Sequence, residues 1–159
     1  MKKNDIILIV VLIGVVVLGF FLMKGEKYEP DYDLPLTLSG KAGLQELTYD
    51  EYQEKIDNDD SFVVIIERKT CTYCEQYMPI AEDFALDEGL PLYYIDTDTF
   101  SNEEHNKLAK SISYFNGKNG NWGTPTTVVQ AGFDTVDYAE GLIDEDKLLE
   151  LYEDNFDME

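Results

Sequence analysis

Apolar and polar residues alternate along most of this 159-residue chain, but not near its start. From Ile6 to Met23 the sequence is one unbroken apolar run without a polar face. As a helix these 18 residues would span about 27 Å, close to the roughly 30 Å of a bilayer's hydrocarbon core. We therefore predict a transmembrane segment over 6–23 rather than a buried helix of a globular core.

The flanks of this run indicate an uncleaved signal anchor. Residues 1–5 form a short tail with Lys2 and Lys3, and no small-residue cleavage site follows the run. Lys24 and Lys27 stand on the other side, so the positive charges on the two flanks are nearly balanced. Because the tail is so short, we expect it to stay inside. The chain is then a single-pass cell-membrane protein whose domain is extracytoplasmic.

After the run, residues 24–42 lack sustained periodicity and contain Gly and Pro among charged residues. We expect a linker there, with a short extended piece near 36–38. A folded domain is expected over 43–159, where segments of strand period and helix period take turns. Its predicted strands are 44–47, 61–67, 91–95, 126–131 and 135–140, and its predicted helices are 48–57, 72–87, 101–112 and 144–152.

The order of these elements predicts the fold class. The run 61–67 is continuously apolar and β-branched, which is typical of a central strand buried on both faces. Strands alternate with helices until the last two strands, which form a hairpin around Gly132. This order predicts an α/β fold in which helices flank a mixed central sheet.

Charge narrows the range of partners. The net charge of −21 argues against nucleic-acid binding, which requires a basic surface. It also argues against adsorption to anionic lipid, so we expect membrane contact through the apolar segment alone. The acidity either keeps the domain soluble or attracts cationic polypeptides, and both interpretations stay open.

The candidate chemistry lies in Cys71 and Cys74, the only cysteines of the chain. They follow the predicted strand 61–67 at once and stand at the start of the predicted helix 72–87. Unpaired amides and the positive end of the helix dipole stabilise a thiolate there, and the thiolate is the attacking species in disulfide exchange. We predict that Cys71 is the nucleophile and that Cys74 resolves the mixed disulfide, with no cofactor besides this redox pair.

A zinc site is the main alternative for these cysteines. A closed zinc site usually takes four ligands, and the single histidine, His105, lies on another predicted element, where we expect a solvated surface position. Asp96 and Asp98 suggest either a metal pair or a strand end followed by a turn. Because a zinc site would need ligands shared between two chains, we expect no metal.

The residues around the cysteines resemble the thioredoxin family. A buried strand leads into Cys-Thr-Tyr-Cys at 71–74, Pro79 stands five residues later, and Gly-Thr-Pro-Thr at 123–126 is similar to the family's cis-proline loop. The predicted hairpin and last helix match the family's ending. The resemblance covers residues 43–159 and implies a thioredoxin-like fold and thiol–disulfide oxidoreductase activity.

The resemblance also implies roles for single residues. Pro125, in a cis peptide bond, would lie against the cysteine pair and help to keep metal out. The backbone of Thr124 would pair with an extended substrate, as in strand addition, and Tyr73 would contact the same substrate. The implied partners are polypeptide substrates with cysteines and a protein that exchanges electrons with the pair. The direction of electron flow stays open.

Two departures from the family pattern bear on the mechanism. Thioredoxins carry a tryptophan just before the first cysteine, where this chain has Thr70. Their buried carboxylate, which helps to deprotonate the resolving thiol, would fall at Ile65. Glu67 has the same strand parity and either substitutes for that carboxylate or lies on the surface at the strand end. Trp122, near the proline loop, either contacts substrate or packs locally.

The approach Arg-Lys-Thr-Cys at 68–71 is similar to that of small Gram-positive thioredoxin-like proteins, including the bacteriocin transport accessory type. This similarity leads to a second hypothesis for the function. The domain would be an accessory or binding subunit of a peptide export or envelope complex. Its acidic face would then dock a partner, and the thiols would be secondary.

Overall fold

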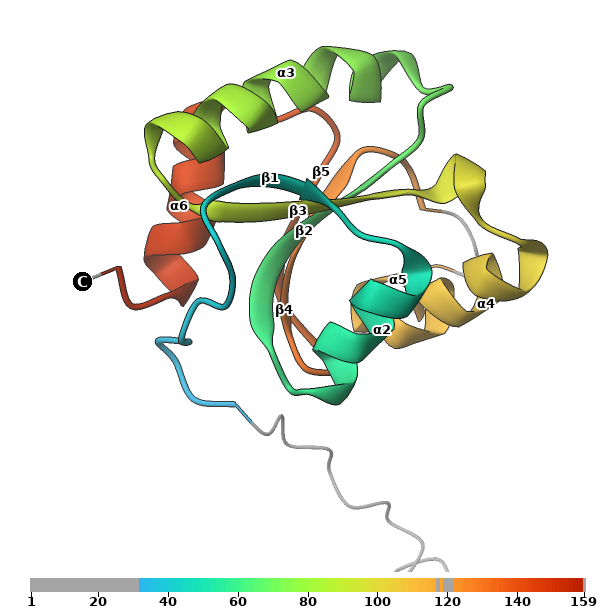
Figure 1. The fold of residues 1–159 in the computed structure, drawn as a ribbon, viewed down its shortest axis with the longest axis horizontal. Coiled ribbons are helices and arrows are strands. Elements are labelled where there is room, and N and C mark those ends of the chain that lie inside the picture. The colour runs from blue at the N-terminus through green and yellow to red at the C-terminus, as the bar shows by residue number, and fades with distance from the viewer. Residues whose placement is uncertain (1–31, 117, 119–121, 159) are drawn as a thin grey trace, which may run out of the picture. The chain divides into compact units, whose positions relative to one another are not determined.

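The computed structural model describes residues 32–116, 118 and 122–158 of the chain. The predicted transmembrane segment 6–23 lies outside this range. Among the described residues, no helix is long and apolar enough to cross a bilayer. A compact unit begins at Tyr32 and contains the sheet and the helices drawn in Figure 1.

The compact unit is built on a five-stranded mixed sheet with the strand order β1-β3-β2-β4-β5. The pairs β1–β3 and β3–β2 are parallel, whereas the pairs β2–β4 and β4–β5 are antiparallel. The elements in chain order are β1 Gly43–Glu46, α2 Tyr49–Asp57, β2 Ser61–Glu67, α3 Thr72–Asp87, β3 Pro91–Asp96, a 3-10 turn Thr97–Thr99, α4 Asn102–Ser111, α5 Ser113–Asn116, β4 Thr126–Ala131, β5 Asp134–Glu140 and α6 Glu145–Asn155. The mixed sheet expected from the sequence is confirmed.

Strand β2 lies at the centre of the sheet because both of its faces are apolar. Val63 and Ile65 belong to the core shared with α3 and α6, while Phe62, Val64 and Ile66 belong to the core shared with α2, α4 and α5. All five side chains are fully buried, as the sequence predicts for this strand. Figure 1 shows α3 and α6 over one face of the sheet and α2 and α4 over the other.

Two capping boxes start helices at the positions expected from the sequence. The amide of Glu51 donates to Thr48 Oγ1 at 3.2 Å, and the amide of Thr48 donates to the Glu51 carboxylate at 2.8 Å. Ser101 and Glu104 repeat this exchange at the start of α4, at 3.3 and 2.7 Å. Each box gives partners to amides that a helix end leaves unpaired, so α2 and α4 begin where these residues stand.

Residues 32–42 belong to the compact unit, whereas the sequence placed them in a linker and began the domain after them. Leu36 is buried and forms a parallel bridge with Phe156 near the C-terminus. Its amide donates to the carbonyl of Asn155 at 2.7 Å, and its carbonyl accepts from the amide of Asp157 at 3.0 Å. The partners lie at the opposite end of the sequence, so local periodicity does not show this docking.

Two further differences lie near the C-terminal half. The sequence does not predict α5, whose Phe115 is buried and stacks on Trp122 with ring centroids 4.3 Å apart. Helix α6 continues to Asn155, past the expected end at Tyr152. The ring of Tyr152 lies 5.7 Å from that of Phe156, and both rings belong to the same core cluster as Leu36. The longer helix therefore ends where the chain packs against residues 32–42.

Candidate active site

Cys71 is the N-cap residue of α3, where the chain leaves β2 and turns into the helix. Its backbone is extended, and its Sγ accepts a hydrogen bond from the amide of Cys74 at 3.3 Å. An oxygen side chain usually takes this capping position. A thiolate at Cys71 therefore meets both an amide donor and the positive end of a 16-residue helix.

The two cysteines differ in access to solvent. Both are free thiols in this structure, Cys71 being partly exposed and Cys74 only 1% exposed. An external disulfide can therefore approach Cys71, whereas Cys74 is reached through Cys71. This order is the one that the sequence predicts for a nucleophile and a resolving thiol.

The two thiols also differ in acidity. Burial raises the pKa of Cys71, but hydrogen bonds with the side chains of Cys74 and Thr124 and with the amides of Cys74 and Tyr73 outweigh burial, so the net pKa is below that of an ordinary cysteine. Burial, followed by the hydrogen bond with Cys71, raises the pKa of Cys74 to about 11. At neutral pH Cys71 is the readier thiolate, and Cys74 keeps its proton.

The loop before β4 lies against Cys71. The peptide bond between Thr124 and Pro125 is cis, as the family resemblance implies, and Pro125 is buried. The Cys71 thiol donates to the carbonyl of Thr124 at 3.2 Å, although 53 residues separate the two in sequence. Thr126 Oγ1 donates to the carbonyl of Gly123 at 2.8 Å, which closes the turn. Tyr73 is 66% exposed on the first turn of α3.

A small cavity of about 240 Å³ adjoins this loop. It is lined by Arg68, Thr97, His105, Trp122, Gly123 and Thr124. Arg68 Nε donates to Thr124 Oγ1 at 3.3 Å, a contact that links the approach to Cys71 with the proline loop. The sequence expectation of a solvated His105 is wrong, since its ring is half-buried and meets the Phe100 ring edge-on at 5.9 Å.

Asp98 holds the segment that leads into Cys71. Its Oδ2 accepts from the amide of Thr70 at 2.9 Å and from the Thr70 hydroxyl at 2.7 Å, and these bonds lower the pKa of Asp98. Asp96 accepts from the amide of Asp98 at 3.0 Å and caps the 3-10 turn. Of the two interpretations of these aspartates, the strand end followed by a turn is the one observed.

Glu67 is buried, at 3% exposed, and the interpretation as a surface residue is wrong. It ends β2 opposite Asp96 of β3. Burial, followed by the charge of Asp96, raises the pKa of Glu67 to about 7. Ile65, where thioredoxins carry their carboxylate, is fully buried in the apolar core under α3. A carboxylate therefore lies under α3, two residues further along the strand.

Comparison with known proteins identifies the fold. No family model matches the chain. A mutant thioredoxin from Halobacterium salinarum NRC-1 has a TM-score of 0.52 and 25% identity over 73% of this chain and 92% of its own. Thioredoxin f from spinach chloroplast has a TM-score of 0.53 and 19% identity, over 77% of this chain and 97% of its own. A thioredoxin from Aeropyrum pernix has a TM-score of 0.50 and 21% identity, over 76% of this chain and 100% of its own. The compact unit has a thioredoxin fold.

Proposed function

We propose that this chain is a thiol–disulfide oxidoreductase that acts on disulfides of proteins or peptides through Cys71 and Cys74. One observation carries the proposal: the partly exposed Cys71 thiol caps α3 and lies 3.2 Å from the carbonyl of Thr124, beside a cis proline. The thioredoxins that share the fold support this activity at the general level.

In the reducing direction, the Cys71 thiolate attacks one sulfur of a substrate disulfide. The substrate S–S bond breaks, a bond to Cys71 Sγ forms, and the first substrate sulfur leaves as a thiolate. Cys74 then gives up its proton and attacks Cys71 Sγ. The mixed disulfide breaks, the second substrate thiolate leaves, and a Cys71–Cys74 disulfide forms. The substrate disulfide has then gained two electrons, which the cysteine pair has lost. A protein redox partner restores the dithiol, and the oxidising direction reverses each step.

The proton of Cys74 needs an acceptor because its pKa of about 11 keeps it bound at neutral pH. We assign this role to Glu67, the buried carboxylate at the end of β2. With a pKa of about 7, Glu67 can hold or release a proton near neutral pH, as a general base requires. This assignment is supported by burial and acidity, and it replaces the family's carboxylate at the position of Ile65.

Substrate would bind as an extended segment along the proline loop. The backbone of Thr124 offers hydrogen bonds of the strand-addition kind, and the exposed ring of Tyr73 offers an apolar contact beside the thiols. The cavity next to Thr124 would take a substrate side chain.

We further propose that residues 6–23 anchor the protein in the cell membrane and that the domain works outside the cytoplasm. The unbroken apolar run supports the anchor. Membrane fractionation tests the anchor, and modification of Cys71 in intact cells by a membrane-impermeant thiol reagent tests the orientation. Recovery of the full chain in the soluble fraction would contradict the anchor.

Reduction of insulin and oxidation of a dithiol peptide test the activity itself. We expect Cys71→Ser to abolish both reactions and Cys74→Ser to accumulate mixed disulfides with substrate. Turnover that survives Cys71→Ser would overturn the proposal. A deletion phenotype rescued by the double serine variant would favour the accessory-subunit hypothesis instead. The reduction potential then decides direction, since a value near about −270 mV is typical of reductases and one near about −120 mV of oxidases.

A further inference from the structure

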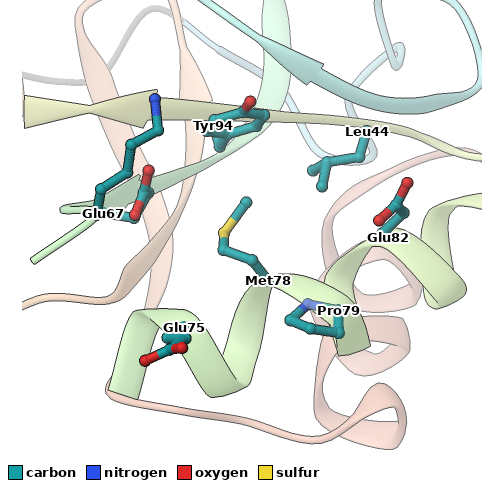
Figure 2. Close-up of a pocket in the computed structure, with 8 residues that line it drawn as sticks. Leu44, Glu67, Glu75, Met78, Pro79, Glu82 and Tyr94 are labelled. Atoms are coloured by element: carbon teal, nitrogen blue, oxygen red, sulfur yellow. The ribbon is translucent and has the colours of Figure 1, made fainter. Parts of the chain in front are cut away.

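A cavity of about 470 Å³ lies beside α3, toward the β1–β3 edge of the sheet. Its lining residues are Leu44, Glu67, Lys69, Glu75, Met78, Pro79, Glu82 and Tyr94. Figure 2 shows the α3 residues on one side of this space and the strand residues on the other. Thr124 precedes β4, across β2 from this edge, so the cavity is separate from the proline loop.

The polar lining of the cavity is mostly acidic. Glu75 and Glu82 are exposed at its rim, and Glu67 is buried within it. Within residues 32–116, 118 and 122–158, none of these three carboxylates makes an ion pair or a side-chain hydrogen bond. Burial, followed by the negative charge of Asp96, raises the pKa of Glu67, and the positive charge of Lys69 offsets this rise only in part. A cation in the cavity would meet the carboxylates of Glu75 and Glu82, and its charge would favour the ionised form of Glu67.

Lys69 is the one basic side chain among the residues that line the cavity, and it is engaged elsewhere. Its Nζ lies 3.0 Å from Asp96 Oδ2 and 3.8 Å from Glu46 Oε1. These carboxylates are not part of the lining. The ammonium group therefore pairs with Asp96 and Glu46 and offsets the charge of Glu67 only in part. Among the described residues it forms no ion pair with Glu75 or Glu82.

The remaining walls are apolar. Leu44, Met78, Pro79 and the ring of Tyr94 line the space between the carboxylates. Long basic side chains bury an apolar stem and keep a charged head against acceptors, so they match this combination. Arginine fits better than lysine, because its planar guanidinium can stack on an aromatic ring and bind carboxylates through two parallel hydrogen bonds.

We propose that this cavity binds a basic side chain, preferably arginine, of the polypeptide substrate. Neither cysteine lines the cavity, but two lining residues are close to them in sequence, since Lys69 stands two residues before Cys71 and Glu75 directly follows Cys74. A polypeptide held at Cys71 can thus place a nearby side chain on this flank of α3. The net charge of −21 favours the approach of such basic chains. The inference rests on the proposed function for its substrate, but the cavity itself can be tested without catalysis.

The kinetic test uses the full-length chain in neutral detergent and two disulfide peptides that differ in one residue near the disulfide. One peptide carries arginine and the other citrulline, which has nearly the same shape but no charge. We expect kcat/KM to be roughly three- to tenfold higher for the arginine peptide, and we expect this preference to shrink in 0.5 M salt. The double variant Glu75→Gln/Glu82→Gln should lose most of the preference, whereas Glu153→Gln, an exposed change on α6, should keep it.

A binding measurement separates this inference from the proposed activity. Met78 lines the cavity, so its methyl resonance in methionine-labelled protein reports occupancy. In the Cys71→Ser variant, N-acetyl-arginine methylamide should shift this resonance and the citrulline analogue should not. Equal responses to both probes, or no response, together with equal kcat/KM for the two peptides, would overturn the inference. A charge-dependent Met78 shift in a protein that turns over no disulfide would overturn only the proposed activity.

Discussion

At the scale of single residues, Cys71 and Cys74 acquire opposite properties although they stand three positions apart. Cys71 caps the helix and receives amide hydrogen bonds, while Cys74 lies one turn inside and is shielded from water. The pKa of Cys71 is lowered and that of Cys74 is raised to about 11. Asymmetry between the two thiols therefore comes from their place on α3 rather than from their residue type.

This asymmetry predicts which thiol reacts first. At pH 7 we expect iodoacetamide to modify Cys71 at least about tenfold faster than Cys74, because the thiolate is the reacting form. Mass spectrometry of the reduced full-length protein measures both rates. In the Cys71→Ser control, Cys74 should stay nearly unmodified until the pH is far above neutral. Equal modification of the two thiols at pH 7 would contradict the expected asymmetry.

Glu67 predicts a pH dependence of stability. Its pKa is about 7 when folded and near the ordinary 4.5 when unfolded, so the folded protein binds the proton more tightly. The contribution of Glu67 is most favourable below pH 4.5 and is lost as the pH rises to about 7. At one pKa unit per 1.36 kcal/mol, the loss is up to about 3 kcal/mol.

Replacing Glu67 by glutamine removes this dependence. We expect Glu67→Gln to have a higher free energy of unfolding than the wild type at pH 8, and the difference to shrink toward pH 4.5. Urea unfolding at several pH values measures it, and Glu153→Gln serves as the exposed control. A difference that is constant with pH would show that Glu67 ionises normally in the fold.

At the scale of elements, residues 32–42 form a strap, a segment that packs on the α3–α6 face of the sheet. Leu36 joins the core of that face and bridges to Phe156 just after α6. The strap is thus held by the buried side chain of Leu36 and by two backbone hydrogen bonds from Leu36 to the chain's C-terminal end.

A matched pair of leucines tests the strap. Leu36 is 5% exposed and Leu34 is 54% exposed, two residues apart. We expect Leu36→Ala to lower the free energy of unfolding by roughly 2–4 kcal/mol, because it opens a cavity in the core. Leu34→Ala should change it by less than about 0.5 kcal/mol. Equal small effects in chemical denaturation would show that the strap adds little to the stability of the domain.

At the scale of the whole molecule, the excess of negative charge makes the free energy of unfolding depend on the salt concentration. Side chains carrying a net charge of −21 repel one another more in the folded state than in the expanded unfolded chain. We expect 0.5 M sodium chloride to raise the free energy of unfolding, by on the order of 1 kcal/mol relative to 20 mM, because salt screens this repulsion. Urea denaturation at the two concentrations measures the change. A decrease with salt would indicate that the ion pairs of Lys55, Lys69 and Lys118 outweigh the general repulsion.

The sequence by itself determined the elements, their order and the position of the thiol pair at a helix start. Strand β2 and helix α3 have the bounds expected from their patterns, and the capping boxes at Thr48 and Ser101 begin helices as expected. These features depend on hydrophobic period and on contacts within about four residues, which a single sequence displays. The mixed sheet followed from the same order of elements.

Only the tertiary structure decided which distant residues meet. The contact of Cys71 with Thr124 spans 53 residues, and Leu36 finds its partner at Phe156. Glu67 stands at a strand end, where the sequence pattern favours a surface position, but in the fold α3 and strand β3 cover it. Burial, and with it the acidity of a side chain, depends on neighbours from other elements. That dependence is why the sequence located the thiols, whereas the fold determined their acidity, their carboxylate and the acidic cavity beside them.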